Sequence, residues 1–402
     1  MFRPTIDARV EECAEQRKFF LRPAILFTFC LLVLTCLRAF TQDDADPDTI
    51  RFYIGTYTTG DSEGIYLGEL DRTEGTLQLV GLAGEAENPS FLALHPTESY
   101  LYAVGELGRY NNRAGGAVFA FAMDKESGML TLLNGESSLA GAPCHIVVDE
   151  TGKCVYAANY SGGNVIGLPI QEDGRVAPVA SLIQHEGSGP NESRQEKAHA
   201  HCVNLDPSGD VLLVCDLGVD RVYLYDINHE TAELSPHDPP FATLKPGDGP
   251  RHLAFHPNEE WVYVINELAS TITAFAYDVE EGELEEFQTI STLPEDFEGR
   301  STTAEVVVHP SGRFVYGSNR GHESIAVFAV DQETGRLTFV ERESCGGSCP
   351  RCFAVDPSGR YMIVANQRTN NIVLYEIDQE DGGLTPTGDE LEVGAPVCIL
   401  VQ

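Results

Sequence analysis

Four charged or ionisable residues stand at the ends of short apolar segments, where residues that only support a fold are rarely of these types. They are His201, Arg251, Glu267 and Arg320. Charged groups are costly in apolar surroundings unless they are paired or solvated, so we expect these four to line a polar, water-filled space. One carboxylate among arginines and histidines suits a reaction that moves one proton and stabilises an oxyanion.

These residues belong to an internal repeat of about fifty residues. Each copy has a short apolar strand, a His-Pro or Asp-Pro turn, and a second strand rich in Val and Tyr. A third strand follows, and a Gly-Xaa-Leu phrase often begins a fourth. The six complete copies begin at Pro89, Pro143, Ala200, Pro250, Thr303 and Pro350. Four short antiparallel strands joined by tight turns are typical of a propeller blade.

A seventh copy is split between the two ends of the repeat region. Pro396 begins an innermost strand, and segments beginning at Arg51, Gly64 and Leu77 supply the other three. Joining them closes a ring and removes exposed sheet edges, which a solenoid would keep. We therefore predict an all-β fold, a seven-bladed β-propeller of four-stranded antiparallel blades whose last blade is closed by the N- and C-terminal strands.

Alignment of the copies gives three columns of residues near the predicted axis. The first column is Ser90, Cys144, His201, Arg251, Ala304, Arg351 and Val397. The second is Phe91, His145, Cys202, His252, Glu305, Cys352 and Cys398. The ends of the second strands carry Glu106, Tyr160, Leu217, Glu267, Arg320 and Gln367. Because adjacent strands are antiparallel, the start of strand one and the end of strand two meet on one face of the ring.

The predicted catalytic residues are Glu267, His201, Arg251 and Arg320. The predicted substrate-binding residues are His199, Arg351, Arg194, His252, Glu305 and Gln367. Arg194 lies in an extra loop, residues 185–196, that interrupts the repeat, and long loops on one face often serve binding. The histidines of the His-Pro turns, His95, His256 and His309, are expected to be structural.

Several of these residues have other interpretations. The arginines could bridge blades through carboxylates, and Glu267 could be their structural partner. His199 and His201, two residues apart on a strand, could be metal ligands or polar packing groups. We predict neither a metal nor a cofactor, since Cys345, Cys349 and Cys352 have no partners at zinc-site spacing. Of the eleven cysteines, three precede residue 40, and we expect the other eight to be buried, reduced thiols.

The composition restricts the partners. The formal net charge of −36 over 402 residues opposes nucleic-acid binding, so we expect a small-molecule substrate and no nucleic acid. Any anion site must then depend on locally placed Arg, Lys or His. A closed propeller is expected to act as a monomer.

The N-terminal region differs in composition from the rest. Arg17, Lys18 and Arg22 precede an apolar run, residues 24–37, that is too short for a comfortable membrane span. Residues 1–42 are predicted to be an export signal or membrane anchor, 43–49 a linker and 50–402 the propeller. Export to the periplasm or cell exterior follows, whereas a misplaced start codon would leave a cytoplasmic protein.

Several phrases in order resemble the seven-bladed lactonase family, which includes a propeller-type 6-phosphogluconolactonase and a carboxymuconate lactonising enzyme. They include ANYSGGNV (158–165), GPNESRQEKAHAH (189–201), GPRHLAFHP (249–257) and NELASTI (266–272). The resemblance runs from Tyr53 to Cys398. In the lactonising branch, the positions matching His201 (or His199), Arg251, Glu267 and Arg320 are the proposed working residues. Lys197-Ala198 and Cys352 depart from the family pattern, which leaves the substrate open.

The resemblance and the charged columns together predict hydrolysis of a sugar lactone, 6-phosphogluconolactone or a related aldonolactone. Glu267, aided by His201, would take a proton from water, and Arg251 and Arg320 would stabilise the oxyanion. One of these arginines or Arg351 would hold a phosphate or carboxylate. The alternatives are a muconate-type lactonising cycloisomerase and a non-catalytic exported propeller that binds protein or glycan.

Overall fold

The computed structural model describes residues 48–402. The predicted export signal or anchor, residues 1–42, and residues 43–47 of the predicted linker lie outside the described residues. Within 48–402, no helix has the length and apolar character of a membrane span.

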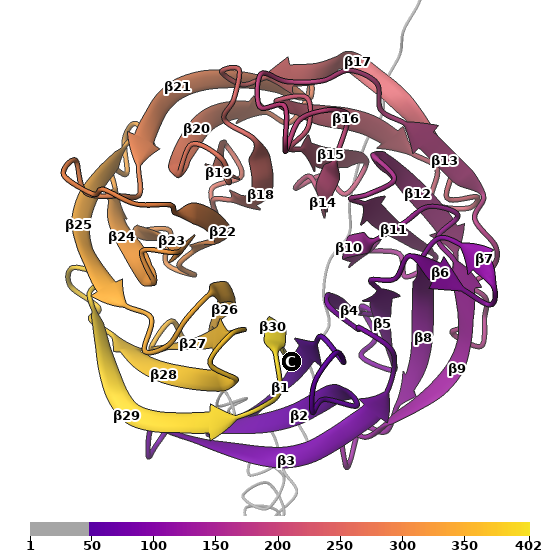
Figure 1. The fold of residues 1–402 in the computed structure, drawn as a ribbon, viewed down its shortest axis with the longest axis horizontal. Helices are drawn as coiled ribbons and strands as arrows, with labels where there is room; N and C mark the ends of the chain where they lie inside the picture. Colours follow the sequence, from indigo (N-terminus) through magenta and orange to yellow (C-terminus); the bar gives the residue numbers. More distant parts are fainter. Residues whose placement is uncertain (1–47) are drawn as a thin grey trace, which may run out of the picture. The chain divides into compact units, whose positions relative to one another are not determined.

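Seven four-stranded antiparallel sheets follow one another around a ring, and each sheet is one blade (Figure 1). From the axis outward, blade 1 is β4 (Leu92–Leu94), β5 (Tyr100–Gly105), β8 (Ala117–Met123) and β9 (Leu130–Ser137). Blade 2 is β10 (Pro143–Val148), β11 (Cys154–Asn159), β12 (Asn164–Pro169) and β13 (Ser181–Gln184). Blade 3 is β14 (Ala200–Leu205), β15 (Val211–Asp216), β16 (Arg221–Ile227) and β17 (Leu234–Thr243).

The remaining blades have the same order. Blade 4 is β18 (Pro250–Phe255), β19 (Trp261–Asn266), β20 (Thr271–Asp278) and β21 (Glu283–Ser291). Blade 5 is β22 (Thr302–Val308), β23 (Phe314–Arg320), β24 (Ser324–Val330) and β25 (Leu337–Ser344). Blade 6 is β26 (Pro350–Val355), β27 (Tyr361–Asn366), β28 (Asn371–Ile377) and β29 (Leu384–Glu392). Blade 7 is β30 (Pro396–Val401), β1 (Thr49–Thr56), β2 (Gly64–Asp71) and β3 (Thr76–Glu85).

A small hairpin, β6 (Arg109–Tyr110) and β7 (Arg113–Ala114), projects between β5 and β8. Blade 7 joins the two ends of the described chain, with Tyr53 of β1 opposite Leu400 of β30. The predicted seven-bladed propeller with a split last blade is therefore confirmed. Closure leaves none of the inner strands of the ring unpaired.

The apolar core lies between blades, in seven clusters that each join two neighbours. Successive residues of a strand point to opposite faces, so one strand serves two clusters. In β19, Tyr263 packs toward blade 5 while Val262 and Val264 pack toward blade 3. Burial on both faces explains why the second strands are almost continuously apolar.

The turn histidines have the structural role predicted for them, and they connect neighbouring blades. His95 donates from Nε2 to the carbonyl of Gly152 (3.0 Å), and His256 and His309 donate to turn carbonyls of the next blade (both 2.8 Å). The eight cysteines of residues 48–402 are free and buried, which confirms the expectation of reduced thiols for this part of the chain.

The innermost strands share an irregularity that decides which side chains reach the axis. In β10, β14, β18 and β26 the pairing with the second strand skips one residue, and in β22 it skips two residues opposite one of β23, so each strand has a β-bulge. In four of them, the extra residues are those of the first column: Cys144, His201, Arg251 and Arg351. A bulge interrupts simple alternation, so neighbouring residues such as Arg251 and His252 can contact the same central groups.

Candidate active site

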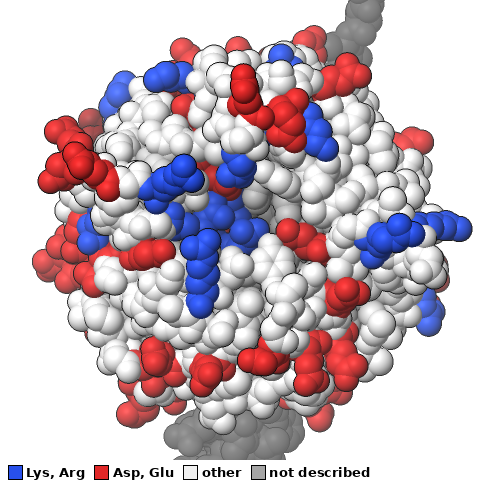
Figure 2. All heavy atoms as spheres, in the orientation of Figure 1, with Lys and Arg blue, Asp and Glu red and all other residues white. Residues whose placement is uncertain are grey.

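A polar pocket with a volume of about 280 Å³ lies at the centre of one face of the ring. Figure 2 shows Lys and Arg side chains gathered around this central hollow, with Asp and Glu mostly around the periphery. The lining residues come from inner strands and from the ends of second strands of several blades. They are Glu106, Cys144, Tyr160, Arg194, His201, Glu267, Thr302, Arg320 and Arg351. The predicted convergence of the columns on one face is thus observed.

Glu267 follows β19 and is held by three arginines. Its Oε1 lies 2.5 Å from Nη2 of Arg194, and its Oε2 lies 3.1 Å from Nε of Arg251 and 2.9 Å from Nη2 of Arg320. Its side chain is only 5% exposed. Burial by itself raises the pKa of Glu267, but Arg320, Arg251 and Arg194 outweigh burial and lower it to about 2. The group is therefore an anion at any physiological pH.

The same arginines are anchored to the propeller backbone. Arg251, which is 2% exposed, donates from Nη1 to the carbonyl of Ala304 (2.6 Å) and to Nε2 of His252 (3.2 Å). Arg320 donates from Nη2 to the carbonyl of Thr303 (2.6 Å). Burial lowers the pKa of Arg251 to about 10, with Arg320 and Arg351 acting in the same direction, so Arg251 stays protonated at neutral pH. These contacts fix the positive charges before any substrate arrives.

Arg194 is brought to the pocket by the loop at residues 185–196. This loop is held by Gln195, whose Nε2 donates to the Leu217 carbonyl (2.9 Å) and to Oδ1 of Asp220 (2.8 Å). Arg194 donates from Nη2 to the Tyr160 hydroxyl (3.1 Å) as well as to Glu267. Its side chain is 35% exposed, so it lies at the mouth of the pocket.

Across the ring, Glu106 follows β5. Its Oε2 accepts hydrogen bonds from the hydroxyls of Tyr57 (2.8 Å) and Ser90 (2.6 Å). Arg351 lies over the Tyr57 ring, 5.4 Å from its centroid, and within residues 48–402 it has neither a hydrogen bond nor an ion pair through its side chain. Burial acts to lower the pKa of Arg351, but Tyr57 and Glu106 raise it above its usual value.

His201 lines the pocket, and its Nδ1 lies 3.9 Å from Sγ of Cys144. Burial holds its pKa well below the ordinary value, and Arg251 and His252 add to this effect, so His201 is neutral. His199 is displaced from the pocket. It hydrogen-bonds the carbonyl of Tyr160 (3.0 Å) and Oε1 of Glu196 (3.1 Å) and stacks on the Tyr160 ring.

Three other predicted substrate-binding residues do not line the pocket. His252 donates from Nδ1 to Oε1 of Glu305 (2.8 Å), and this buried pair contacts the site through Arg251 and through the His201 ring, whose centroid lies 5.3 Å from that of His252. Burial raises the pKa of Glu305 to about 7, although Arg251 and His145 oppose it. Gln367 lies beside Cys349, with its Oε1 3.6 Å from the sulfur.

No cluster of three or more His, Cys, Asp or Glu side chains within 48–402 is arranged to hold a metal ion. His199 and His201 both contact the Tyr160 ring, His199 by stacking (4.6 Å between centroids) and His201 edge-on (5.5 Å).

Four pocket residues were absent from the sequence-based site prediction: Glu106, Cys144, Tyr160 and Thr302. The column alignment contained three of them, because Cys144 shares a column with Arg251, and Glu106 and Tyr160 share one with Glu267. Column position was therefore a better guide to the site than residue type.

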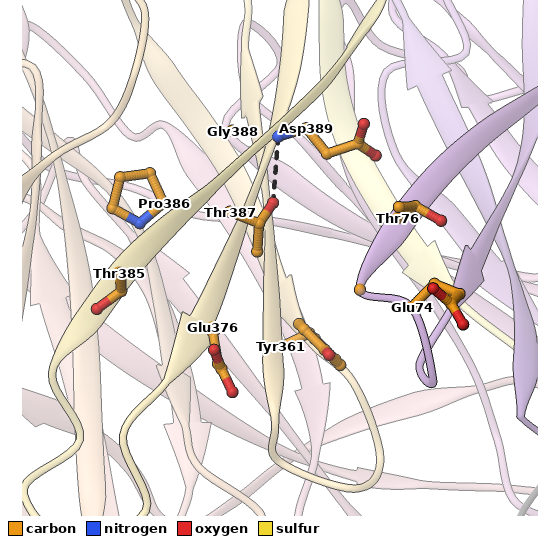
Figure 3. Close-up of a pocket in the computed structure, with 10 residues that line it drawn as sticks. Glu74, Thr76, Tyr361, Glu376, Thr385, Pro386, Thr387, Gly388 and Asp389 are labelled. Carbon is orange, nitrogen blue, oxygen red and sulfur yellow. Dashed lines mark hydrogen bonds between the residues drawn. The ribbon is translucent and has the colours of Figure 1, made fainter.

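A larger hollow of about 440 Å³ lies at the outer edge between blades 6 and 7 (Figure 3). Its carboxylates include Glu74, Glu376 and Asp389, and its lining contains no arginine or histidine. Asp389 accepts a hydrogen bond from the backbone of Leu77 and so joins β29 to β3. The groove therefore lacks the groups that could stabilise an oxyanion.

The chain is therefore a seven-bladed β-propeller with an arginine-rich axial pocket, and comparisons with known proteins identify its family. The family model described as lactonase, 7-bladed beta-propeller matches residues 51–401. A 6-phosphogluconolactonase of Bacillus subtilis is 41% identical over 302 residues, which cover 75% of this chain and 83% of that protein.

Solved structures give the same result. A putative 6-phosphogluconolactonase from Bacteroides fragilis superimposes with a TM-score of 0.83 at 34% identity, covering 89% of this chain and 99% of that one. The periplasmic gluconolactonase of Pseudomonas aeruginosa superimposes with a TM-score of 0.82 at 33% identity, covering 88% of this chain and 99% of that one. The chain belongs to the seven-bladed β-propeller lactonase family, and it is a lactonase.

Proposed function

We propose that this lactonase opens an aldonolactone, 6-phosphogluconolactone or its unphosphorylated counterpart, to the free acid in the axial pocket. The charge balance of the pocket carries this proposal. Arg194, Arg320 and Arg351 line the pocket together with two carboxylates, and Arg251 is paired to Glu267 just outside the lining, in a chain whose formal net charge is −36. This local excess of positive charge attracts an anionic substrate and stabilises an anionic transition state.

The arginines divide the work by position. Arg194 is at the mouth, where it can bind a substrate phosphate while keeping one face in solvent. Arg251 and Arg320 supply fixed positive potential, and Arg351 has donors that no residue of 48–402 occupies. The relatives support both substrates, because their names include a 6-phosphogluconolactonase and a gluconolactonase.

Glu267 as the general base remains a prediction. Its pKa of about 2 makes it a weak proton acceptor in this arrangement. We propose that its main contribution is to hold three arginines in place as their shared counter-charge. His201 is neutral and can donate or accept a hydrogen bond at the reacting centre.

The test compares the full chain on glucono-1,5-lactone and on its 6-phosphate, with spontaneous opening subtracted. We expect acceleration of both, with kcat/KM higher for the phosphorylated lactone. Arg194→Gln should reduce that preference several-fold through KM, and Arg175→Gln, at an exposed arginine outside the pocket, is the matched control. A wild-type chain that accelerates neither reaction would refute the proposal.

We also propose export, since the basic and apolar N-terminal pattern accompanies a relative named as periplasmic. Fractionation of cells carrying the full chain with a C-terminal tag tests this, and a tag found only in the cytoplasm contradicts it. We propose further that the enzyme acts as a monomer, which light scattering on the purified chain measures directly.

A further inference from the structure

Two carboxylates reach the pocket, and they differ in how their oxygens are occupied. Both oxygens of Glu267 lie against arginines. In Glu106, Oε2 accepts two hydroxyl hydrogen bonds, whereas Oε1 has no hydrogen-bond or ion-pair partner within residues 48–402. A general base needs an accessible lone pair, and Glu106 Oε1 is the one pocket carboxylate oxygen with no hydrogen-bond or ion-pair partner among residues 48–402, whereas each Glu267 oxygen lies against at least one arginine.

The contacts of Glu106 also fix its orientation. Tyr57 and Ser90 both donate to Oε2, and Ser90 is buried at the start of the innermost region of blade 1. Burial raises the pKa of the Tyr57 hydroxyl above its ordinary value, so this hydroxyl keeps its proton and remains a donor. With Oε2 held on the protein side, Oε1 is the oxygen left for the pocket that Glu106 lines.

Arg351 complements this carboxylate without occupying it. The two groups interact electrostatically, but no Arg351 nitrogen lies within 4.0 Å of a carboxylate oxygen of Glu106. Arg351 is also fixed, since its guanidinium lies over the Tyr57 ring. On one side of the pocket, a carboxylate oxygen and a guanidinium without hydrogen-bond or ion-pair partners can supply the general base and the oxyanion stabilisation that speed water addition to a carbonyl.

We propose that Glu106 is the general base of this lactonase and that Arg351 receives the lactone carbonyl oxygen, an inference that rests on the proposed lactone hydrolysis. Glu106 Oε1 takes one proton from water as the water oxygen bonds to the carbonyl carbon. The carbonyl electron pair moves to oxygen beside Arg351. When the carbonyl re-forms, the ring C–O bond breaks, and the departing ring oxygen takes the proton back from Glu106. The products are the hydroxy acid and the original carboxylate.

The first test is Glu106→Gln, which keeps an acceptor for Tyr57 and Ser90 and removes the base. We expect kcat to fall about 100-fold or more, with KM and melting temperature close to wild type. Glu136→Gln, at a residue outside the pocket, is the matched control.

The second test distinguishes proton transfer from a structural role. Glu106→Ala should regain activity when formate is added, because a small carboxylate can occupy the vacated position, and Glu267→Ala should not. Protein-free formate controls are subtracted. Formate rescue of Glu106→Ala supports the proposal.

Two results would overturn it while lactone hydrolysis stands. One is a Glu106→Gln enzyme within tenfold of the wild-type kcat, and the other is an inactive Glu106→Ala that formate does not restore. A wild-type chain that opens neither lactone is a different result, because it removes the proposed function and this inference with it.

Discussion

The two sides of the pocket contain similar residues but use them in opposite ways. The Glu267 side consists of Arg194, Arg251, Glu267 and Arg320. Here all three arginines form ion pairs with the one carboxylate. The Glu106 side consists of Tyr57, Ser90, Glu106 and Arg351, and within 48–402 its Oε1 of Glu106 and its Arg351 guanidinium have no hydrogen-bond or ion-pair partner. Ion pairs hold charged groups in fixed positions, whereas proton transfer and substrate binding need groups whose hydrogen-bonding positions are not already occupied by the protein.

Their positions in the ring differ in the same sense. The Glu267 side comes from blades 4 and 5 and the loop before blade 3, which are consecutive in the chain. The Glu106 side comes from blades 1, 6 and 7, so it forms only when the two ends of the described chain meet (Figure 1). Ring closure therefore assembles the half of the pocket to which we assign proton transfer.

The largest expected effect is on stability. Glu267→Gln removes the counter-charge of three arginines, and we expect the free energy of unfolding to fall by about 3 to 5 kcal/mol at neutral pH. A loss of stability agrees with the Glu267 pKa of about 2. A carboxyl group whose pKa is lower in the folded protein than in the unfolded chain stabilises the fold at pH values above its unfolded pKa, and this stabilisation is lost as the pH falls toward 2. Urea denaturation measures this.

The comparison variant is Glu106→Gln, which keeps both hydroxyl hydrogen bonds and should change the free energy of unfolding by less than about 1 kcal/mol. Equal destabilisation by the two variants would contradict the division between the two sides.

The next effect is on catalysis. Arg351→Met leaves no protein ion pair broken within 48–402, so we expect kcat/KM to fall about 100-fold, or about 3 kcal/mol, with the unfolding midpoint nearly unchanged. Arg351→Lys should recover part of the rate. Steady-state kinetics and denaturation on the same samples check this, and a large loss of stability with intact kcat would assign Arg351 to the structural side.

The smallest effect per group is the pH dependence of stability. Burial holds the pKa values of His145, His201 and His252 well below 6.5. Their contribution to the free energy of unfolding is therefore fully present above pH 6.5. It is lost as the pH falls below 6.5, because the unfolded chain then binds protons that the folded protein does not. Each can contribute up to about 1.4 kcal/mol per pH unit. Glu305, whose pKa is raised to about 7, has the opposite effect, because it increases the free energy of unfolding as the pH falls from 7 to 4.5. It is one group against three histidines.

We therefore expect the free energy of unfolding to decrease between pH 6.5 and 5. His145→Gln should reduce the slope of the free energy of unfolding against pH by roughly the contribution of one of the three histidines. Denaturation series at several pH values measure the slope, and a flat wild-type profile would show that these histidines are not held neutral.

The repeat made most of the fold predictable. The spacing of the turns predicted seven blades, and the split last copy predicted ring closure. Comparison of copies also predicted that Arg251, Glu267 and Arg320 would meet, because equivalent positions of a closed ring face one axis.

Other assignments depended on local backbone geometry that a repeat does not encode. His199 turns toward Glu196, and His252 and Glu305 pair beneath Arg251 because bulges shift the inner strands. Gln367 follows β27 yet lies against Cys349, outside the pocket lining.

By itself, the sequence determined the blade count, the closure of the ring and the polar nature of its centre, because these follow from periodic patterns of apolar and charged residues. Only the tertiary structure decided that both oxygens of Glu267 are paired with arginines and that one oxygen of Glu106 has no hydrogen-bond or ion-pair partner within 48–402. The number of partners around Glu267 and Glu106 depends on distances of a few ångströms between side chains of different blades, and such distances exist only once the ring has closed.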